Sequence, residues 1–401
     1  MGQAVDNEVV LLAREFDDLL KGLKDDFVGR DETIEVIALA TLCREHVLLI
    51  GPPGTAKTAL LNRFAQLFGT TDEKALTFTY LLTRFTEPTE LFGPVDITQF
   101  QQGRYRVKTD GMLPRVPLAF LDEVFEGSSA ILNSLLTLIN ERVFYNGSQP
   151  EPSELITLLG SSNQIPEDPV LAAFSDRFLL RTELSYVADD ELGRVLHNGW
   201  AGEQQLIRAA GEGRSLVAPS MDASFTLAKL AVLQDAVAKV DLSPITASYL
   251  EVLRSLRRDK IAFSDRRAVK AQKVFAASAV LDGRRAADPT DLGMLAYLWT
   301  ERRDQDTIRR ALEVKGIEIT RRDRVRQPVE IMHALQELLN NRRAVRTMQD
   351  LWEVSNGIST LRRELRQDHP TAVTEFKRVD EEREATARLI DERRRQEDGD
   401  V

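Results

Sequence analysis

The chain has 401 residues, 43% of them hydrophobic, which is enough for two or three domains and a large buried core. Its 53 basic and 63 acidic residues give a formal net charge of -10, which argues against broad nucleic-acid binding because such affinity comes mainly from neutralised phosphates. A single cysteine, Cys43, excludes an intrachain disulfide. The sequence contains no run of about 18 apolar residues that would predict a membrane span, and its start lacks the pattern of a signal peptide. We therefore expect a cytoplasmic protein.

Helical and strand patterns alternate over the first half of the chain. Amphipathic helices are predicted over residues 8–22 and 31–42, with a turn between them. Strands are then predicted over residues 47–50, 76–80, 118–121, 155–161 and 178–184. This alternation indicates a mostly parallel sheet flanked by helices, an α/β fold. Between the second and third strands, residues 92–115 form two alternating segments broken by Gly103, and they predict a β-hairpin insertion.

Strand patterns end at about residue 188, after which the sequence is helical. Residues 212–220 are the expected link to a small bundle of helices over residues 221–240, 244–259, 265–282 and 289–300. From about residue 301 the chain is strongly charged, with apolar residues at the spacing of long helices that pack in a hairpin, and its end from residue 380 is expected to fray or be disordered. The predicted domains are therefore an αβα core at 1–195, an all-helical domain at 215–300 and a charged helical region at 301–401.

A glycine-rich loop, GPPGTAKT at residues 51–58, follows the first strand and leads into a helix. Gly51 and Gly54 let the backbone turn sharply and aim its N–H groups inward, and the helix N-terminus adds partial positive charge. Lys57 is expected to reach the β and γ phosphates of a nucleotide, and Thr58 to ligate Mg²⁺. The alternative is an ordinary glycine turn. The predicted nucleotide-contacting residues of this loop are Gly51, Pro52, Pro53, Gly54, Thr55, Ala56, Lys57, Thr58 and Ala59.

An acidic pair, Asp122 and Glu123, ends the apolar strand at residues 118–121. Asp122 is the expected second ligand of Mg²⁺, and Glu123 is placed to polarise a water molecule against the γ phosphate. Alone, the pair is weak support, because strand ends are often acidic simply for solvation. Together with the glycine-rich loop it predicts hydrolysis of ATP with Mg²⁺ as cofactor.

Three further segments carry a family resemblance, namely TRFTEPTELFGPVD at 83–96, GRYRVKTDGMLP at 103–114 and AILNSLLTLINER at 130–142. With both nucleotide motifs, the chain resembles the MoxR family of AAA+ ATPases over about residues 20–300, and most of all its RavA branch. The resemblance implies a P-loop AAA+ core with an insertion in its second helix, followed by an all-helical lid. RavA-like proteins can carry a small β-rich module in their C-terminal region; no strand pattern follows residue 300 here, so contacts attributed to that module do not carry over.

The resemblance also implies roles for single residues. Asn163 matches sensor 1, whose amide would help Glu123 hold the attacking water. The alternative is an asparagine that serves a turn. Arg177 matches the arginine finger that reaches the nucleotide of a neighbouring subunit, and an intrachain salt bridge is the alternative. Glu141 and Arg142 face either a subunit interface or solvent at a helix end.

Two further implied roles concern the lid and the base. Arg266 resembles sensor 2, through which the lid would sense the nucleotide, but the adjacent Arg267 leaves the choice open and a helix-cap arrangement is the alternative. Val28 and Gly29, with Phe27 before them, resemble the loop that receives adenine. Simple core packing of these residues is the alternative.

Membership of this family implies a homo-oligomeric ring, a hexamer, that uses ATP to remodel or mature a client protein, together with a partner that carries a von Willebrand factor A (VWA) domain. A nucleic-acid motor, or the motor subunit of a restriction-type nuclease, is the alternative, and charge discriminates the two. The insertion carries both bases and acids, namely Arg104, Arg106, Lys108, Asp96 and Asp110. A nucleotide-gated scaffold that turns over little is a third possibility, against which the intact motifs count.

Overall fold

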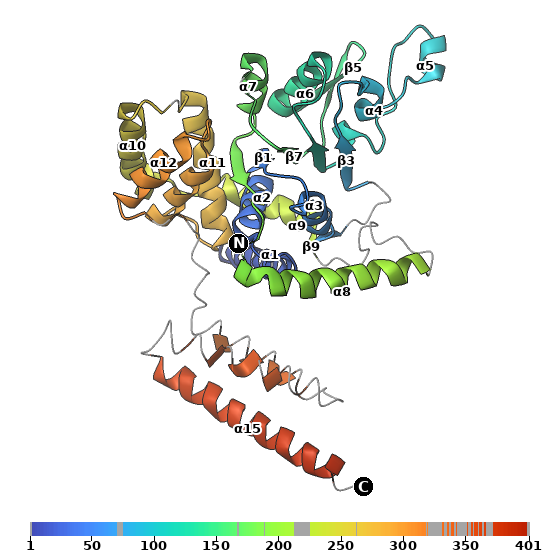
Figure 1. The fold of residues 1–401 in the computed structure, drawn as a ribbon. Coiled ribbons are helices and arrows are strands. Elements are labelled where there is room, and N and C mark those ends of the chain that lie inside the picture. Colours follow the sequence, from blue (N-terminus) through green and yellow to red (C-terminus); the bar gives the residue numbers. More distant parts are fainter. Residues whose placement is uncertain are drawn as a thin grey trace. The chain divides into compact units, whose positions relative to one another are not determined.

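The computed structural model describes residues 2–69, 75–166, 168–187, 189–211, 225–261, 263–317 and 319, and parts of 331–398 (Figure 1). The chain divides into two units, Met1–Arg321 and Arg322–Val401, and each is described by itself. In the described residues, every helix is too short or too polar to cross a membrane.

The first unit is built on a five-stranded parallel sheet with the order β3-β4-β7-β1-β8. The strands are β1 (Val47–Ile50), β3 (Thr77–Leu81), β4 (Leu118–Asp122), β7 (Thr157–Ser162) and β8 (Leu180–Glu183). These are the five strands that the sequence predicts, with ends that differ by about one or two residues. The α/β fold class is therefore confirmed. Since all five strands run the same way, everything that follows them lies at one edge of the sheet, the carboxyl edge, and everything that precedes them lies at the amino edge.

Helices cover this sheet, and both predicted N-terminal helices are present. They are α1 (Gly2–Asp26) and α2 (Asp31–Cys43), which pack on each other. Helix α2 also packs on β1, β7 and β8, and ten of its residues are buried, as a helix between a sheet and other helices must be. The other helices of the core are α3 (Lys57–Ala65), α6 (Ser129–Glu141) and α7 (Pro169–Ser175).

The insertion differs from the β-hairpin that the sequence predicts. It contains two short helices, α4 (Pro88–Phe92) and α5 (Ile97–Gln101), and a 3-10 turn, η1 (Leu113–Arg115). Its two segments meet in a single antiparallel bridge, from Val95 to Val107. The reason is local: the side chain of Asp96 accepts hydrogen bonds from the N–H groups of residues 98 and 99, and so starts a helix where alternation alone favours a strand.

A β-hairpin does occur nearby, after α6, where the sequence analysis placed none. Strands β5 (Val143–Asn146) and β6 (Gln149–Pro152) pair in antiparallel fashion. The side-chain amide of Asn146 donates to the carbonyl of Val107 at 3.2 Å and accepts from its N–H at 2.8 Å. The insertion is thus fastened to the hairpin by backbone-like bonds from one side chain.

The lid follows a long helix, α8 (Leu192–Gly211), that begins after the short turn η2 (Asp189–Glu191). The predicted link at 212–220 lies outside the described residues. The lid helices are α10 (Ser243–Arg258), α11 (Asp265–Leu281), the 3-10 segment η3 (Pro289–Tyr297) and α12 (Asp304–Glu313). Helix α12 packs on α10 and η3, so this bundle continues beyond the predicted boundary at residue 300.

One segment of the predicted helical domain belongs to the core as much as to the lid. Strand β9 (Phe225–Thr226) pairs in parallel with β2 (Phe68–Gly69), which follows α3. The next helix, α9 (Leu227–Val237), packs on α1, α2 and α11. Core and lid therefore share one continuous hydrophobic core.

The second unit has an apolar core of its own and is helical where it is described. Its longest helix, α15 (Val373–Asp398), continues through the charged stretch that the sequence predicts to be disordered. The reason is that Val379, Thr386 and Ile390 are buried along it. Two ion pairs add support, Arg362 to Asp380 at 2.5 Å and Arg342 to Glu382 at 2.8 Å. The buried apolar cluster consists of Ile331, Leu335, Leu339, Val354, Ile358, Leu361, Leu365 and Val379.

Candidate functional site

The glycine-rich loop has the tight backbone that its sequence predicts. A side chain at Gly51 would place its Cβ 2.2 Å from the carbonyl oxygen of Leu184, so only glycine fits there. Gly54 and Ala56 have positive φ angles of 79° and 61°. Left-handed residues let the chain curl back on itself, and an alanine in this conformation is strained. The loop leads directly into α3, which begins at Lys57.

Lys57 is buried, and its ammonium group lies against its own loop. Nζ donates to the carbonyl oxygen of Gly51 at 2.6 Å and to that of Pro52 at 3.3 Å. Burial lowers the pKa of Lys57, while Asp122 and Glu123 oppose that shift, which shows that the two acidic residues face the lysine. Thr58 and Ala59, the next residues of α3, are exposed.

The acidic pair lies at the end of β4, on the same carboxyl edge. Asp122 Oδ1 accepts from the hydroxyl of Ser161 and, at 3.1 Å, from the N–H of Glu123. Glu123 has a positive φ of 49°. Burial and the charge of Asp122 raise the pKa of Glu123, and Lys57 opposes the rise. The carboxylate of Asp122 and the exposed hydroxyl of Thr58 are hard oxygen ligands of the kind that Mg²⁺ prefers.

Strand β7 joins the two motifs through consecutive residues. The carbonyl of Ser162 accepts from the N–H of Gly51 at 3.0 Å, and the amide Nδ2 of Asn163 donates to Glu123 Oε1 at 2.7 Å. The structure thus brings Lys57, Asp122, Glu123 and Asn163 together. Sequence reasoning found Asn163 but missed Ser161, two residues before it, for which only its place at the end of a buried strand could have served as a signal.

The turn predicted to receive adenine lies beside the segment that follows β8. Arg30 donates to the carbonyl of Ser185 at 2.9 Å, and a Cβ at Gly29 would lie 3.6 Å from Val187. Tyr186, 68% exposed, approaches the carbonyl of Pro53 with its hydroxyl at 3.4 Å. Residues 185–187 therefore connect the phosphate loop to the turn of Gly29, although the sequence analysis did not single them out. Val28 is buried, which is also what simple core packing requires.

Arg177 and Arg266 lie together at the amino edge. Arg177 precedes β8, and its guanidinium is 3.5 Å from Asp176. Arg266 begins α11 and donates to Asn140 at 2.7 Å, and both arginines line one small pocket. A strand of β8's length, Leu180–Glu183, spans about 13 Å. Both guanidinium groups thus lie across the sheet from the phosphate loop of their own chain.

Arg267 and Arg142 have structural roles. Arg267 is 3% exposed and donates to the carbonyls of Leu179 and Leu298 at 2.9 and 3.0 Å and to Asp176 at 2.9 Å. Arg142 donates to the carbonyls of residues 155 and 156 at 2.7 and 3.0 Å. The expectation that Arg142 faces a subunit interface or solvent is corrected, because its bonds lie inside the core. Its burial lowers its pKa to about 10.

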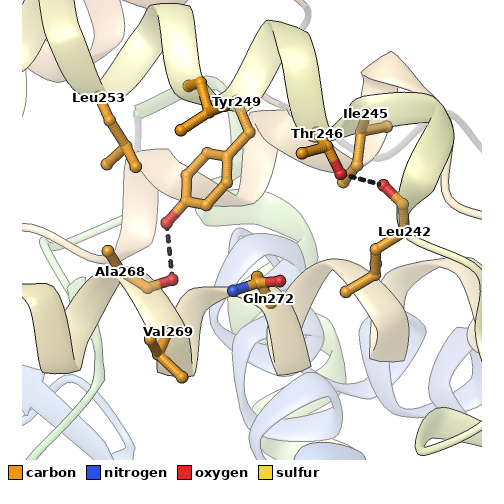
Figure 2. Close-up of a pocket in the computed structure, with 9 residues that line it drawn as sticks. Leu242, Ile245, Thr246, Tyr249, Leu253, Ala268, Val269 and Gln272 are labelled. Carbon is orange, nitrogen blue, oxygen red and sulfur yellow. Dashed lines mark hydrogen bonds between the residues drawn. The ribbon is translucent and has the colours of Figure 1, made fainter.

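A separate cavity of about 160 Å³ lies in the lid between α10 and α11 (Figure 2). Its one polar contact among the drawn side chains across the two helices is the hydroxyl of Tyr249, which donates to the carbonyl of Ala268 at 2.8 Å. It holds none of the predicted site residues. The lining residues are Leu242, Ile245, Thr246, Tyr249, Leu250, Leu253, Ala268, Val269 and Gln272.

A parallel sheet with this strand order, a phosphate loop after its central β1, an acidic pair on β4 and a helical lid define the AAA+ class of P-loop proteins. Residues 14–216 match the family model of the MoxR domain in the MoxR-vWA-beta-propeller ternary systems, and residues 245–312 match an AAA lid domain. The chain belongs to the MoxR family of AAA+ ATPases.

Relatives agree with this family. A protein of Methanocaldococcus jannaschii is 35% identical over 281 residues, which cover 70% of either chain. Chaperone MoxR1 of Mycobacterium tuberculosis is 30% identical over 182 residues, which are 44% of this chain and 45% of that one. The solved structure of a proposed ATPase from Cytophaga hutchinsonii shares the fold, with a TM-score of 0.60 at 17% identity, and covers 80% of this chain and 99% of its own. Membership of the RavA branch stays a prediction.

Proposed function

We propose that the chain is the subunit of a ring-forming ATPase that couples ATP hydrolysis to the remodelling of a client protein. One observation carries the proposal: Asn163 holds the carboxylate of Glu123 at 2.7 Å, at the sheet edge where Lys57 and Asp122 also lie. A carboxylate fixed beside a phosphate loop is what the attack of water on a phosphoryl group requires.

In this proposal each residue has one task. Lys57 exchanges its loop carbonyls for phosphate oxygens, which is favourable because an anion replaces two neutral acceptors. Thr58 and Asp122 hold Mg²⁺, which neutralises phosphate charge when bound. Glu123 orients the attacking water and accepts its proton, and Asn163 keeps the carboxylate from turning away. The raised pKa of Glu123 suits a proton acceptor.

The position of the arginines supports assembly. Since Arg177 and Arg266 lie at the amino edge, across the sheet from the phosphate loop of their own chain, they suit the nucleotide of a neighbouring subunit. Arg177 Nε is buried without a partner in the described residues, and its Nη1 contacts the adjacent Asp176 at 3.5 Å. The guanidinium is therefore available to an incoming phosphate. A closed ring, a hexamer as in the family, satisfies every site at once.

A protein client and a VWA-domain partner follow from the company that the family keeps. The matched model describes MoxR domains of MoxR-vWA systems, and one relative is named a chaperone. The nucleic-acid motor is less well supported. Arg106 of the insertion is not free to contact phosphates, because it pairs with Glu151 at 2.5 Å, and the chain as a whole is acidic.

Two variants test the site. Lys57→Ala is expected to weaken ATP binding, because it removes the contact to phosphate. Glu123→Gln is expected to bind ATP like the unaltered protein and to stall hydrolysis, because only the water loses its acceptor. Calorimetry measures the first quantity and phosphate release the second. Equal loss of ATP affinity in both variants would remove Glu123 from its assigned role.

A mixing experiment tests the ring. Arg177→Ala subunits keep their Glu123 and lack the finger, whereas Glu123→Gln subunits keep the finger. In mixed rings some intact Glu123 sites face an intact Arg177, so we expect activity to rise above that of either variant alone. Subunit exchange is confirmed separately with labelled protein. Absence of recovery at every mixing ratio would instead assign Arg177 to its own chain.

A further inference from the structure

Ser161 contacts the residues on both sides of Glu123. It lies on β7 and is completely buried. Its hydroxyl donates to Asp122 Oδ1, and its carbonyl oxygen accepts from the N–H of Val124 at 2.9 Å. One residue of the neighbouring strand therefore holds the residue before Glu123 by its side chain and the residue after it by its backbone.

Glu123 needs such support. Its φ of 49° lies in the left-handed region, which costs a residue with a side chain about 1–2 kcal/mol. Strained residues persist when their surroundings fix them from several directions. With Asp122 and Val124 both held by Ser161, the strained backbone directs the carboxylate of Glu123 toward the amide of Asn163, 2.7 Å away.

The hydroxyl of Ser161 also divides the tasks of the two oxygens of Asp122. Within the described part of the chain, both hydrogen bonds to Asp122, from Ser161 and from the N–H of Glu123, end on Oδ1. Oδ2 is left for a metal ion. Groups that hydrogen-bond a ligating carboxylate fix its orientation, and their loss typically lowers metal affinity or activity about 10–100-fold.

We propose that Ser161 is a positioning residue of the ATPase site, which orients Asp122 for Mg²⁺ and holds the strained backbone that aims Glu123. The inference rests on the proposed ATPase function. It assigns a task to a side chain that touches neither phosphate nor water, and it predicts that removal of this hydroxyl weakens the metal's contribution while the contact of the loop with phosphate persists.

The test compares Ser161→Ala with a matched control, Thr157→Val. Thr157 begins the same strand, is equally buried, and donates its hydroxyl to the carbonyl of Ala40 at 3.3 Å, so the control also removes one buried hydroxyl from β7. ADP affinity is measured by calorimetry in EDTA and in Mg²⁺. Ser161→Ala is expected to keep its affinity in EDTA within about twofold and to lose about tenfold or more of the gain that Mg²⁺ gives. Thr157→Val is expected to keep both.

A second variant and a second readout complete the test. Ser161→Thr, which restores a hydroxyl, is expected to recover the gain from Mg²⁺, and the Mg²⁺ concentration for half-maximal hydrolysis is expected to rise for Ser161→Ala alone. An unchanged gain in Ser161→Ala, or an equal loss in Thr157→Val, would overturn the inference. If the unaltered protein binds ADP more tightly in Mg²⁺ and hydrolyses ATP, such a result refutes the role of Ser161 alone; if it does neither, the proposed function fails.

Discussion

The two edges of the central sheet both gather charged side chains, and they use them in opposite ways. At the carboxyl edge, Lys57 and Glu123 are held by few bonds, and the backbone at Ala56 and Glu123 is strained. At the amino edge, most charged groups are buried and engaged. Glu45 lies between Lys270 at 2.6 Å and Lys273 at 2.5 Å, and these lysines hold its pKa below its ordinary value although burial acts the other way.

His46 and Arg267 show the same engagement at the amino edge. His46 Nδ1 accepts from the N–H of Leu158 at 2.9 Å, and its Nε2 lies 3.3 Å from the carbonyl of Ile139. Arg267 binds carbonyls of both core and lid. The contrast teaches that charge alone does not mark a functional site. Strain and unspent hydrogen-bonding capacity mark the reactive edge, whereas cations that bind strand-start carbonyls hold the fold together.

The comparison is sharpened most by Arg177, which lies at the amino edge but belongs functionally to a nucleotide site. Arg177→Ala is expected to lower turnover about 10³-fold or more, as the loss of other arginine fingers does, while ATP binding persists. The free energy of unfolding is expected to change by less than about 0.5 kcal/mol, because only a contact to Asp176 is lost. Phosphate release and denaturant unfolding measure the two quantities. A large loss of stability would place Arg177 among the structural arginines.

The next largest effect is expected at Arg267. Arg267→Met removes bonds to two carbonyls and to Asp176 and leaves them buried, which is expected to lower the free energy of unfolding by about 2–4 kcal/mol. The matched control is Arg266→Met, whose exposed contact with Asn140 contributes less than about 0.5 kcal/mol. Urea unfolding of both variants measures this difference. Equal stabilities would show that the lid does not depend on Arg267.

His46 gives the amino edge a pH dependence. Burial, with Arg142 and the two lysines near Glu45, lowers the pKa of His46 well below 6.5. The unfolded chain therefore binds a proton below about pH 6.5 that the folded chain refuses, so stability falls as the pH falls, by up to about 1.4 kcal/mol per pH unit. Thermal unfolding between about pH 7.5 and 5.5 should show this loss, and His46→Gln should flatten it. An unchanged slope in His46→Gln would assign the dependence to another group.

The smallest effect on basal activity is expected in the insertion. Arg106 is tied to Glu151, which leaves Arg104 and Lys108 as the cations to test. Replacing both by alanine is expected to leave basal ATP hydrolysis within about twofold, because they lie outside the phosphate loop, and to remove stimulation by a protein partner. Hydrolysis is measured with and without the partner. Selective loss of a stimulation by DNA would favour the motor instead, and collapse of basal hydrolysis would place the insertion in the ring interface.

The sequence predicts the strands and the phosphate site well because each depends on local pattern. Buried parallel strands read as short apolar runs, and GPPGTAKT carries its own turn and helix start. The hairpin of β5 and β6 was also predictable, since Asn146-Gly147 is a strong hairpin-turn dipeptide, but it was overlooked. Helix α5 was mistaken for a strand because one capping side chain, Asp96, outweighs the alternation that follows it.

The arginines could not be separated from the sequence. Arg266 and Arg267 are neighbours of the same type, and which one is buried depends on where α11 meets the carbonyls that precede β8, far away in the chain. Arg142 is similarly decided by carbonyls that precede β7. The disorder predicted after residue 380 fails for the same reason, because buried positions along α15 depend on partners that composition does not reveal.

The short pairing of β2 with β9 sets a schedule for synthesis of the chain. Phe225 stacks on Phe16, with ring centroids 5.1 Å apart, and meets the edge of Phe68 at 6.1 Å. Ribosomes add roughly 5–20 residues per second, so the stretch from Phe68 to Phe225 takes on the order of 8 to 30 seconds. During that interval the emerging N-terminal segment lacks the ring that completes its aromatic cluster. A chain that ends at Gly211 never acquires this ring, so the nucleotide-binding half cannot be excised as a stable fragment and is born dependent on the half that follows.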